Sequence, residues 1–215
     1  MKDFPWDRFL LGAGGAIAGF GLLALNSFFS PTVRQLGKRA HFLVGFLVNG
    51  LGMTLIVACS LWLSILPPRL DWDPFLYLGV AAAAAGAALY AASATRVGRL
   101  STLSEYSIEL DVEGLYAISR HPQALAMSLL AIGLGGLSQS IPYLALLPIV
   151  IAGWYLYSWL EEELELVPVF ADRYREYSRA TPRMVPSAGV LADWMVDRVA
   201  VLKSLTPKGG SEERR

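Results

Sequence analysis

A long apolar passage with one short polar break constrains the fold of this chain more than any other feature. The passage runs between polar clusters at residues 120–122 and 161–163, and the break lies around residues 138–142. At 1.5 Å per residue, its two halves form helices of about 24 and about 30 Å, close to the thickness of a bilayer core. A tight turn between them would return the chain to the membrane face where it entered. Both polar clusters would then meet there, and ionisable groups so close to hydrocarbon indicate a functional site.

The composition places the chain in a membrane. Hydrophobic residues make up 54% of its 215 residues and charged residues only 17%, and the mean hydropathy is +0.46, which is too apolar for an ordinary soluble domain. The net charge is zero, so nothing suggests nucleic acid as a partner. The single cysteine, Cys59, excludes an internal disulfide, and no group of Cys and His residues has the spacing of a metal site.

Three earlier apolar runs are also long enough to span a membrane. With the two halves of the passage, the predicted spans are residues 10–29, 41–66, 74–93, about 123–137 and about 143–160. The expected fold is all-α: a multi-pass transmembrane bundle of about five spans, with a C-terminal helical hairpin and cytosolic amphipathic helices. The spacing of Phe170, Tyr174 and Tyr177 predicts one amphipathic helix, and residues 190–202 predict another.

The chain divides into three regions. Residues 1–93 form a three-span membrane region, residues 94–186 carry the hairpin and its polar clusters, and residues 187–215 form an amphipathic helix and a disordered tail. In the first span, Gly15 and Gly19 make a small-xxx-small step, which seats a neighbouring helix more often than it marks a binding site. That step would serve a homodimer or an internal contact equally well.

The distribution of Lys and Arg predicts the orientation. With five spans, three of the 18 basic residues fall on the side of the N-terminus, and the remaining fifteen fall on the other side. The positive-inside rule therefore puts the N-terminus outside and the C-terminus in the cytoplasm, in an integral membrane protein whose expected location is a bacterial inner membrane. The polar end of the hairpin then opens to the cytosol, where soluble cofactors are available.

The polar clusters suit a ligand that carries both charges. Glutamates at the C-terminal end of a helix face an unfavourable macrodipole, so a nearby cation would stabilise them. Arg120 can bind a carboxylate through two hydrogen bonds, and His121 can donate or accept. Such a set fits an amino-acid moiety. The alternative is a helix end that emerges into water, where glutamates and arginines are ordinary.

Several motifs around the hairpin occur in a fixed order. They read Gly114-x-Tyr116-x-x-x-Arg120-His121-Pro122, then Glu162-Glu163-x-x-Leu166-x-x-x-Phe170-x-x-x-Tyr174-x-x-Tyr177, then Pro182-Arg183-x-x-Pro186. In this order the motifs resemble the isoprenylcysteine carboxyl methyltransferase and phospholipid methyltransferase superfamily. The resemblance covers about a third of the chain, and the first three spans add only a compatible number of helices.

This resemblance implies a multi-pass enzyme that uses S-adenosylmethionine without a dinucleotide-binding domain. It implies no metal. The residues that it implies for cofactor binding are Leu115, Tyr116, Arg120, His121, Pro122, Glu162, Glu163 and Tyr174. The residues that it implies for catalysis are Arg120, Glu162 and Arg183.

The chain departs from the family pattern in three places. Gln123 and Ala124 stand where the family commonly has an aromatic residue, which affects one wall of the pocket. Ala171 replaces the usual glycine, a mild change. An extra acidic residue, Glu161, makes the register of the acidic pair ambiguous by one, although the positions of the later motif residues favour Glu162 and Glu163.

The sequence does not name the methyl acceptor, which is expected to be lipophilic or small. A carboxylate, a thiol and an amine all remain open, and membrane lipids are expected neighbours. No residue outside the cofactor motif is an obvious base, which favours a nucleophile that is already anionic.

Two other classes of protein are alternatives. The membrane sterol and steroid reductases share a related region but use a nicotinamide cofactor, and a 2′-phosphate would call for a basic cluster where this chain has three consecutive glutamates. A non-catalytic membrane scaffold is the second alternative. A transporter is disfavoured because no ionisable residue lies in the middle of the first three spans and no inverted repeat is visible.

Overall fold

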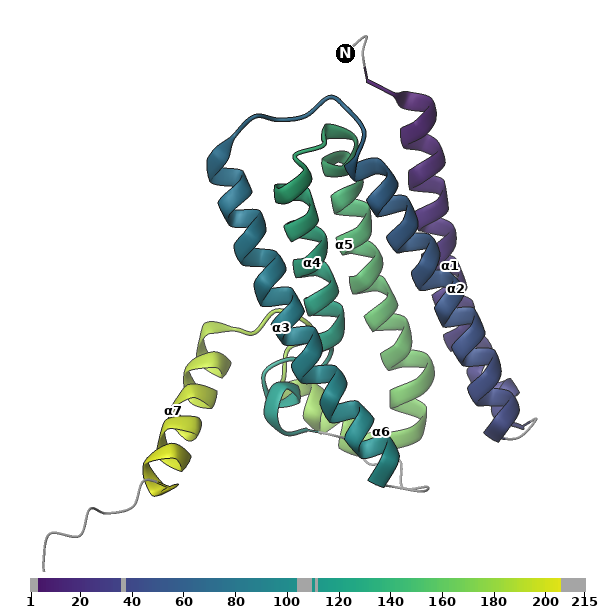
Figure 1. Cartoon of the computed structure of the whole chain (residues 1–215). Helices are drawn as coiled ribbons and strands as arrows, with labels where there is room; N and C mark the ends of the chain where they lie inside the picture. The colour runs from purple at the N-terminus through teal and green to yellow at the C-terminus, as the bar shows by residue number, and fades with distance from the viewer. Residues whose placement is uncertain (1–3, 36–37, 104–109, 111, 206–215) are drawn as a thin grey trace, which may run out of the picture.

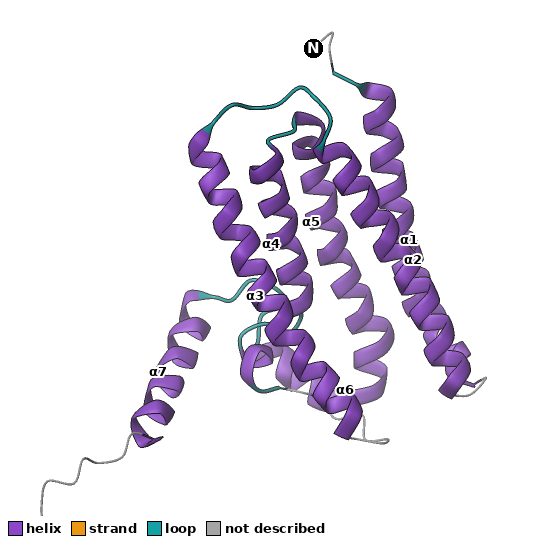
Figure 2. Ribbon diagram, viewed as in Figure 1, coloured by secondary structure: helices purple, strands orange, loops and turns teal. Residues whose placement is uncertain are grey.

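The chain folds into a bundle of long helices (Figures 1 and 2). The computed structural model describes residues 4–35, 38–103, 110 and 112–205, and no strand occurs among them beyond one isolated bridge between Arg69 and Ser140. The all-α prediction is therefore confirmed. The helices are α1 (Trp6–Gln35), α2 (Lys38–Ser64), α3 (Asp73–Leu103), α4 (Pro122–Ser138), α5 (Ile141–Glu161), α6 (Val167–Ala180) and α7 (Ala188–Leu205), with a 3₁₀ turn η1 (Gly114–Ala117) and a π turn η2 (Glu162–Leu166).

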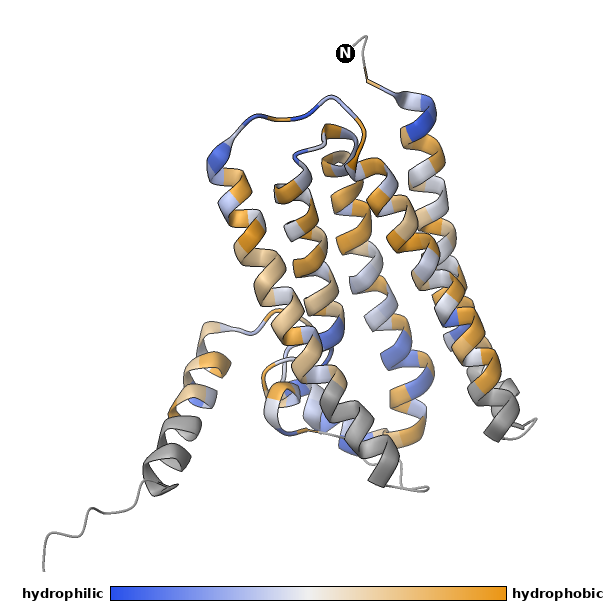
Figure 3. Ribbon diagram, viewed as in Figure 1, coloured by the Kyte–Doolittle hydropathy of each residue, from blue (hydrophilic) through white to orange (hydrophobic). Residues whose placement is uncertain are grey.

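Within the described residues, four helices are long and apolar enough to cross a membrane: Trp6–Phe29, Leu43–Ser64, Asp73–Ala94, and the continuous helix that starts with α5 at Ile141. Figure 3 shows apolar residues along these helices and hydrophilic ones towards the end of the bundle where α5 meets α6. Large apolar side chains are exposed on the outside, among them Leu10, Phe46 and Leu78. Such a surface is expected where lipid is the solvent, and the structure supports a membrane protein.

The predicted spans differ from the structure in two respects. The fourth run forms α4, which has only 17 residues and is shorter than the other four, because Pro122 begins it and the break at residue 139 ends it. The third run continues as α3 to Leu103, whereas the predicted third span ends at residue 93. The sequence from 94 to 103 is polar but lacks proline, so nothing in it stops a helix that leaves the apolar layer.

Small residues let the helices approach closely. Gly15 lies against the sulfur of Cys59, and a Cβ on Gly19 would lie 2.7 Å from the carbonyl oxygen of Gly52. The predicted small-xxx-small step therefore forms an internal contact between α1 and α2. In the same way, a Cβ on Gly136 of α4 would lie 2.5 Å from the Cα of Gly79 in α3. Helix α5 packs against α1, α2 and α4 at the centre.

The polar break forms the tight turn of the predicted hairpin. Gln139 ends α4 in the left-handed conformation with φ 51°, and Ser140 caps α5. The Ser140 hydroxyl lies 2.7 Å from the carbonyl oxygens of both Leu63 and Leu66 at the end of α2. This turn fixes one end of α4 and α5, so the start of α4 and the end of α5 meet at the opposite end of the bundle (Figure 1).

The C-terminal region contains helices at both positions where amphipathic helices were expected, and α6 has the expected two faces. On α6, Tyr174 and Tyr177 are buried while Arg173, Arg175 and Glu176 are exposed, as the aromatic spacing predicts. Helix α7 points away from the bundle (Figure 1), and its Trp194 indole donates to the carbonyl oxygen of Gly114 at 3.1 Å. The tail predicted to be disordered, from residue 206, lies outside the described residues.

Candidate functional site

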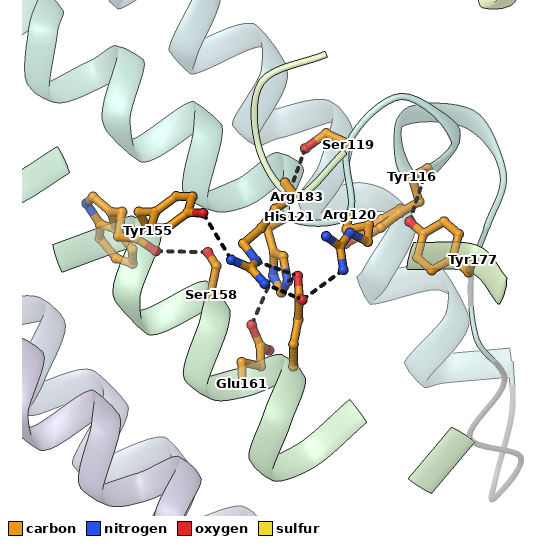
Figure 4. Close-up of polar contacts among 11 residues, drawn as sticks. Tyr116, Ser119, Arg120, His121, Tyr155, Ser158, Glu161, Tyr177 and Arg183 are labelled. Atoms are coloured by element: carbon orange, nitrogen blue, oxygen red, sulfur yellow. Dashed lines mark hydrogen bonds and ion pairs between the residues drawn. The ribbon is translucent and has the colours of Figure 1, made fainter. Parts of the chain in front are cut away.

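Two segments far apart in sequence pair just below the start of α4. The amide of Arg120 donates to the carbonyl oxygen of Pro182 at 3.0 Å, and the amide of His121 donates to the carbonyl oxygen of Arg183 at 2.9 Å. The Ser119 hydroxyl also donates to the Arg183 carbonyl oxygen at 3.3 Å. These bonds form because α6 ends at Thr181 in an extended conformation. They bring Arg183 beside the Arg120–His121 pair (Figure 4).

Glu162 is the centre of the site. Its side chain is only 3% exposed, and it accepts hydrogen bonds from three cationic groups. Arg120 Nη1 lies 2.8 Å from Oε2, and His121 Nε2 lies 2.9 Å from Oε1. Arg183 binds both oxygens at once, through Nε and Nη2, each at 3.0 Å. Such charge-assisted and bidentate bonds are the strong ones in proteins, and they compensate the cost of burying the carboxylate.

The π turn that begins at Glu162 gives this carboxylate its position. A π turn widens the helix by one residue and is frequent at functional sites. Glu161 is the last residue of α5 and Glu162 is the first of η2, so their side chains leave the helix in different directions. Both reach His121, which lies just before α4.

His121 lies between two carboxylates. Its Nδ1 is 3.2 Å from Oε2 of Glu161, and its Nε2 is 2.9 Å from Oε1 of Glu162 (Figure 4). The side chain is 7% exposed. Burial alone would lower the pKa of His121, but its hydrogen bonds to Glu161 and Glu162 outweigh that effect and raise the pKa above the ordinary value. The two carboxylates therefore favour the protonated form of His121.

Arg183 extends the site towards the outer surface of α5. Its Nη1 donates to the hydroxyl of Tyr155 at 3.1 Å, and its guanidinium carbon lies 5.3 Å from the centre of the Tyr155 ring. The Tyr155 side chain is half exposed on the lipid-facing side of the helix. The hydrogen bond to Glu162 raises the pKa of Arg183 above its already high ordinary value, so this arginine stays charged.

Two buried polar atoms beside Glu162 lack a hydrogen-bond partner in the described part of the chain: Nε of Arg120 and the hydroxyl of Tyr174. The Tyr174 hydroxyl interacts electrostatically with Arg120 and Glu162, but neither contact has the geometry of a hydrogen bond. The neighbouring Tyr177 donates to the carbonyl oxygen of Tyr116 at 2.6 Å. Buried donors without partners are rare in folded proteins, so this pair is a candidate for binding a polar ligand atom.

The structure brings most of the residues predicted from the sequence together. Arg120, His121, Glu162 and Arg183 form one hydrogen-bonded cluster, and Tyr116 and Tyr174 adjoin it. Pro122 is buried as the first residue of α4, and Leu115 is half-buried in η1, where its carbonyl oxygen accepts from the amides of Ile118 and Ser119. Glu163 is exposed and makes no hydrogen bond or ion pair within the described ranges.

Sequence reasoning missed three members of the site. Glu161 was seen only as an ambiguity of register, whereas the structure pairs it with His121. Tyr155 precedes Glu162 by two helical turns, a spacing that puts both residues on one face and could have identified it. Ser119 gave no signal in the sequence.

The basic side chains of the site outnumber the acidic ones. Arg120, His121 and Arg183 face Glu161 and Glu162. The site therefore favours a ligand with a carboxylate or a similar anionic group. Among the residues that the structure describes, no group of three His, Cys, Asp or Glu side chains could hold a metal ion.

No protein-family model, no curated protein and no solved structure matches this chain.

Proposed function

We propose that this chain is an integral membrane methyltransferase that uses S-adenosylmethionine to methylate a lipophilic or small acceptor. One observation carries the proposal: the motif residues Arg120, His121, Glu162 and Arg183 converge on one buried cluster at the polar end of the hairpin. These are the residues through which the sequence resembles the isoprenylcysteine carboxyl methyltransferase and phospholipid methyltransferase superfamily.

The unpaired donors of the site fit one end of the cofactor. The amino-acid end of S-adenosylmethionine carries a carboxylate, which could accept from Arg120 Nε and from the Tyr174 hydroxyl, the two buried atoms that lack partners. Glu162 already binds three cations, so its role in the proposed complex is to hold Arg120, His121 and Arg183 in place rather than to bind the ammonium group itself. When bound, the cofactor supplies an electrophilic methyl group on a positively charged sulfur.

The protein's own contribution would be alignment and exclusion of water. Glu162 and its partners are buried at the end of the apolar layer, and Tyr155 connects Arg183 with the lipid-facing surface. An acceptor with an apolar tail would approach from the bilayer on that side. The proposed orientation puts the cluster at the cytosolic face, where the cofactor is available.

Calorimetry with the detergent-purified protein tests the proposal. We expect S-adenosylhomocysteine to bind and NADPH not to bind. Replacing Arg120 by alanine should weaken binding by about tenfold or more, because a hydrogen bond from a charged group contributes about 1.5–3 kcal/mol. The exposed Glu176→Gln variant on α6 is the matched control and should bind like the wild type.

Three outcomes would count against the proposal. Binding of NADPH alone would point to a reductase. If well-folded protein bound neither ligand, the non-catalytic scaffold would be the better interpretation. Loss of binding in Glu176→Gln with no loss in Arg120→Ala would show that the ligand contacts another part of the surface.

A further inference from the structure

Glu161 is the member of the site to which the methyltransferase motifs give no role. It lies at the end of α5, its side chain is 34% exposed, and its Oε2 is 3.2 Å from Nδ1 of His121. Glu162 contacts the other ring nitrogen of the same histidine at 2.9 Å. The imidazole is therefore held between two carboxylates on consecutive residues (Figure 4).

This arrangement determines the ionisation of the histidine. An ionised carboxylate can only accept hydrogen bonds. A neutral imidazole has one N–H group and one bare nitrogen, so in either tautomer the bare nitrogen would face a carboxylate oxygen without a proton between them. Only the protonated ring donates to both carboxylates at once.

Other charged groups near the ring act against this protonation. Arg120 and Arg183 share Glu162 with His121, from the segment before α4 and the segment after α6. Glu162 is thus partly neutralised by two guanidinium groups. Glu161 has no other cationic partner in the part of the chain that is described, so its charge acts mainly on His121.

We propose that Glu161 is a positioning residue that keeps His121 as a doubly donating cation and so prevents it from acting as a general base. With both nitrogens committed as donors, the ring has no lone pair with which to take a proton from a substrate. Glu161, rather than the exposed Glu163, is then the functional partner of Glu162 in the acidic run.

If the methyltransferase function is correct, the proposal narrows the chemical class of the methyl acceptor. A protonated amine or a thiol would need a base, and His121 could not serve. The acceptor would therefore present a nucleophile that is already anionic, such as a carboxylate. This consequence rests on the proposed function, whereas the state of His121 does not.

Nitrogen NMR of isotopically labelled histidine tests the proposal directly. The chain has only two histidines, so a His41→Gln background leaves the signals of His121 alone. In this background we expect both ring nitrogens to remain protonated above pH 6.5, the ordinary midpoint of a histidine.

Variants of the acidic run identify the residue that is responsible. Glu161→Gln should lower the midpoint of His121 by about one unit, a tenfold loss of proton affinity, because it removes one adjacent negative charge. Glu163→Gln should leave the midpoint unchanged, and Glu161→Asp should restore part of the effect. If Glu161 only stabilised the fold, these three variants would not differ in the midpoint of His121.

Two results would overturn the inference. One is a neutral His121 at pH 7 in the folded protein, which needs no Glu161 variant and so decides the question even if Glu161→Gln does not fold. The other is equal midpoints in Glu161→Gln and Glu163→Gln. Loss of S-adenosylhomocysteine binding with a protonated His121 would refute the methyltransferase proposal alone.

Discussion

Ala171 is in a backbone conformation that favours glycine. It lies inside α6 with φ 47° and ψ −120°, where the helix kinks between Phe170 and Asp172. A side chain with a Cβ is strained there, and strain of this kind costs about 1–3 kcal/mol. Glycine would remove the strain but would lose about 0.5–1 kcal/mol through the greater freedom of the unfolded chain. Ala171→Gly should therefore stabilise the protein by about 1 kcal/mol.

Thermal unfolding followed by circular dichroism measures this effect. For a chain of this size, a gain of about 1 kcal/mol raises Tm by about 2–4 °C. Ala171→Val should lower Tm, because a β-branched side chain fits the positive φ less well than alanine. The matched control is Ala85→Gly on the exposed face of α3, where glycine within a regular helix should cost about 0.5–1 kcal/mol.

The order of the Tm values of these variants tests whether residue 171 has the kinked conformation. If Ala171→Gly lowered Tm as Ala85→Gly does, residue 171 would have ordinary helical angles and the strain argument would be wrong. The family pattern has glycine at this position, and the structure gives a physical reason for that preference. Replacement by alanine, which the sequence alone marks as mild, is then a measurable loss of stability.

Three further predictions follow from other parts of the molecule. Gly136→Ala should destabilise by about 1–3 kcal/mol, because its Cβ would meet the backbone of Gly79; Gly21→Ala, which has open space around it, should not lower Tm. Ser140→Ala should cost about 1–2 kcal/mol by removing the cap of α5 and the contact with the end of α2; a Tm equal to that of the wild type would refute that role. Because the pKa of His121 is raised in the folded state, its contribution to stability is complete below about pH 6.5 and is lost as the pH rises through the folded-state value; Tm should fall over that range, and His121→Gln should abolish the dependence.

The fold could be predicted well from the sequence because each membrane helix corresponds to a long apolar run of residues. Each of the five runs became a helix, and the break at residues 138–142 became the turn of a hairpin. What the apolar pattern could not set was the exact end of each helix. The polar end of α3 continues to Leu103 because backbone hydrogen bonding does not depend on an apolar side chain.

The site could be predicted only in part. The hairpin brings Arg120 and His121 close to the glutamates whatever the details, because the two helices start and end at the same face. The register of the acidic run could not be read, since a π turn begins at Glu162 and shifts the helix by one residue. Glu161 and Glu162 both contact His121, a pairing that the sequence did not indicate.

Arg183 shows a different limit of sequence reasoning. Its place in the site depends on the kink at Ala171 and on the two backbone hydrogen bonds that pair residues 182–183 with residues 120–121. None of these features has a local sequence signal that predicts its partner. Only the likeness to a family motif pointed to Arg183, and the structure gives that position a physical role: it supplies two of the four hydrogen bonds to Glu162.

Both carboxylate oxygens of Glu162 are already occupied by hydrogen bonds, and this determines which substitutions can test ligand binding. Three cations from different segments meet at this carboxylate, so removing it would leave buried positive charges without a partner, at a cost of about 3–5 kcal/mol. Loss of ligand binding in a Glu162 variant would then follow from a damaged fold as readily as from a missing contact. Glu161 and Glu163 flank Glu162 and differ in one respect, since Glu161 contacts His121 and Glu163 is exposed. Comparing these two neighbours separates the chemistry of the site from its stability, which Glu162 itself cannot do.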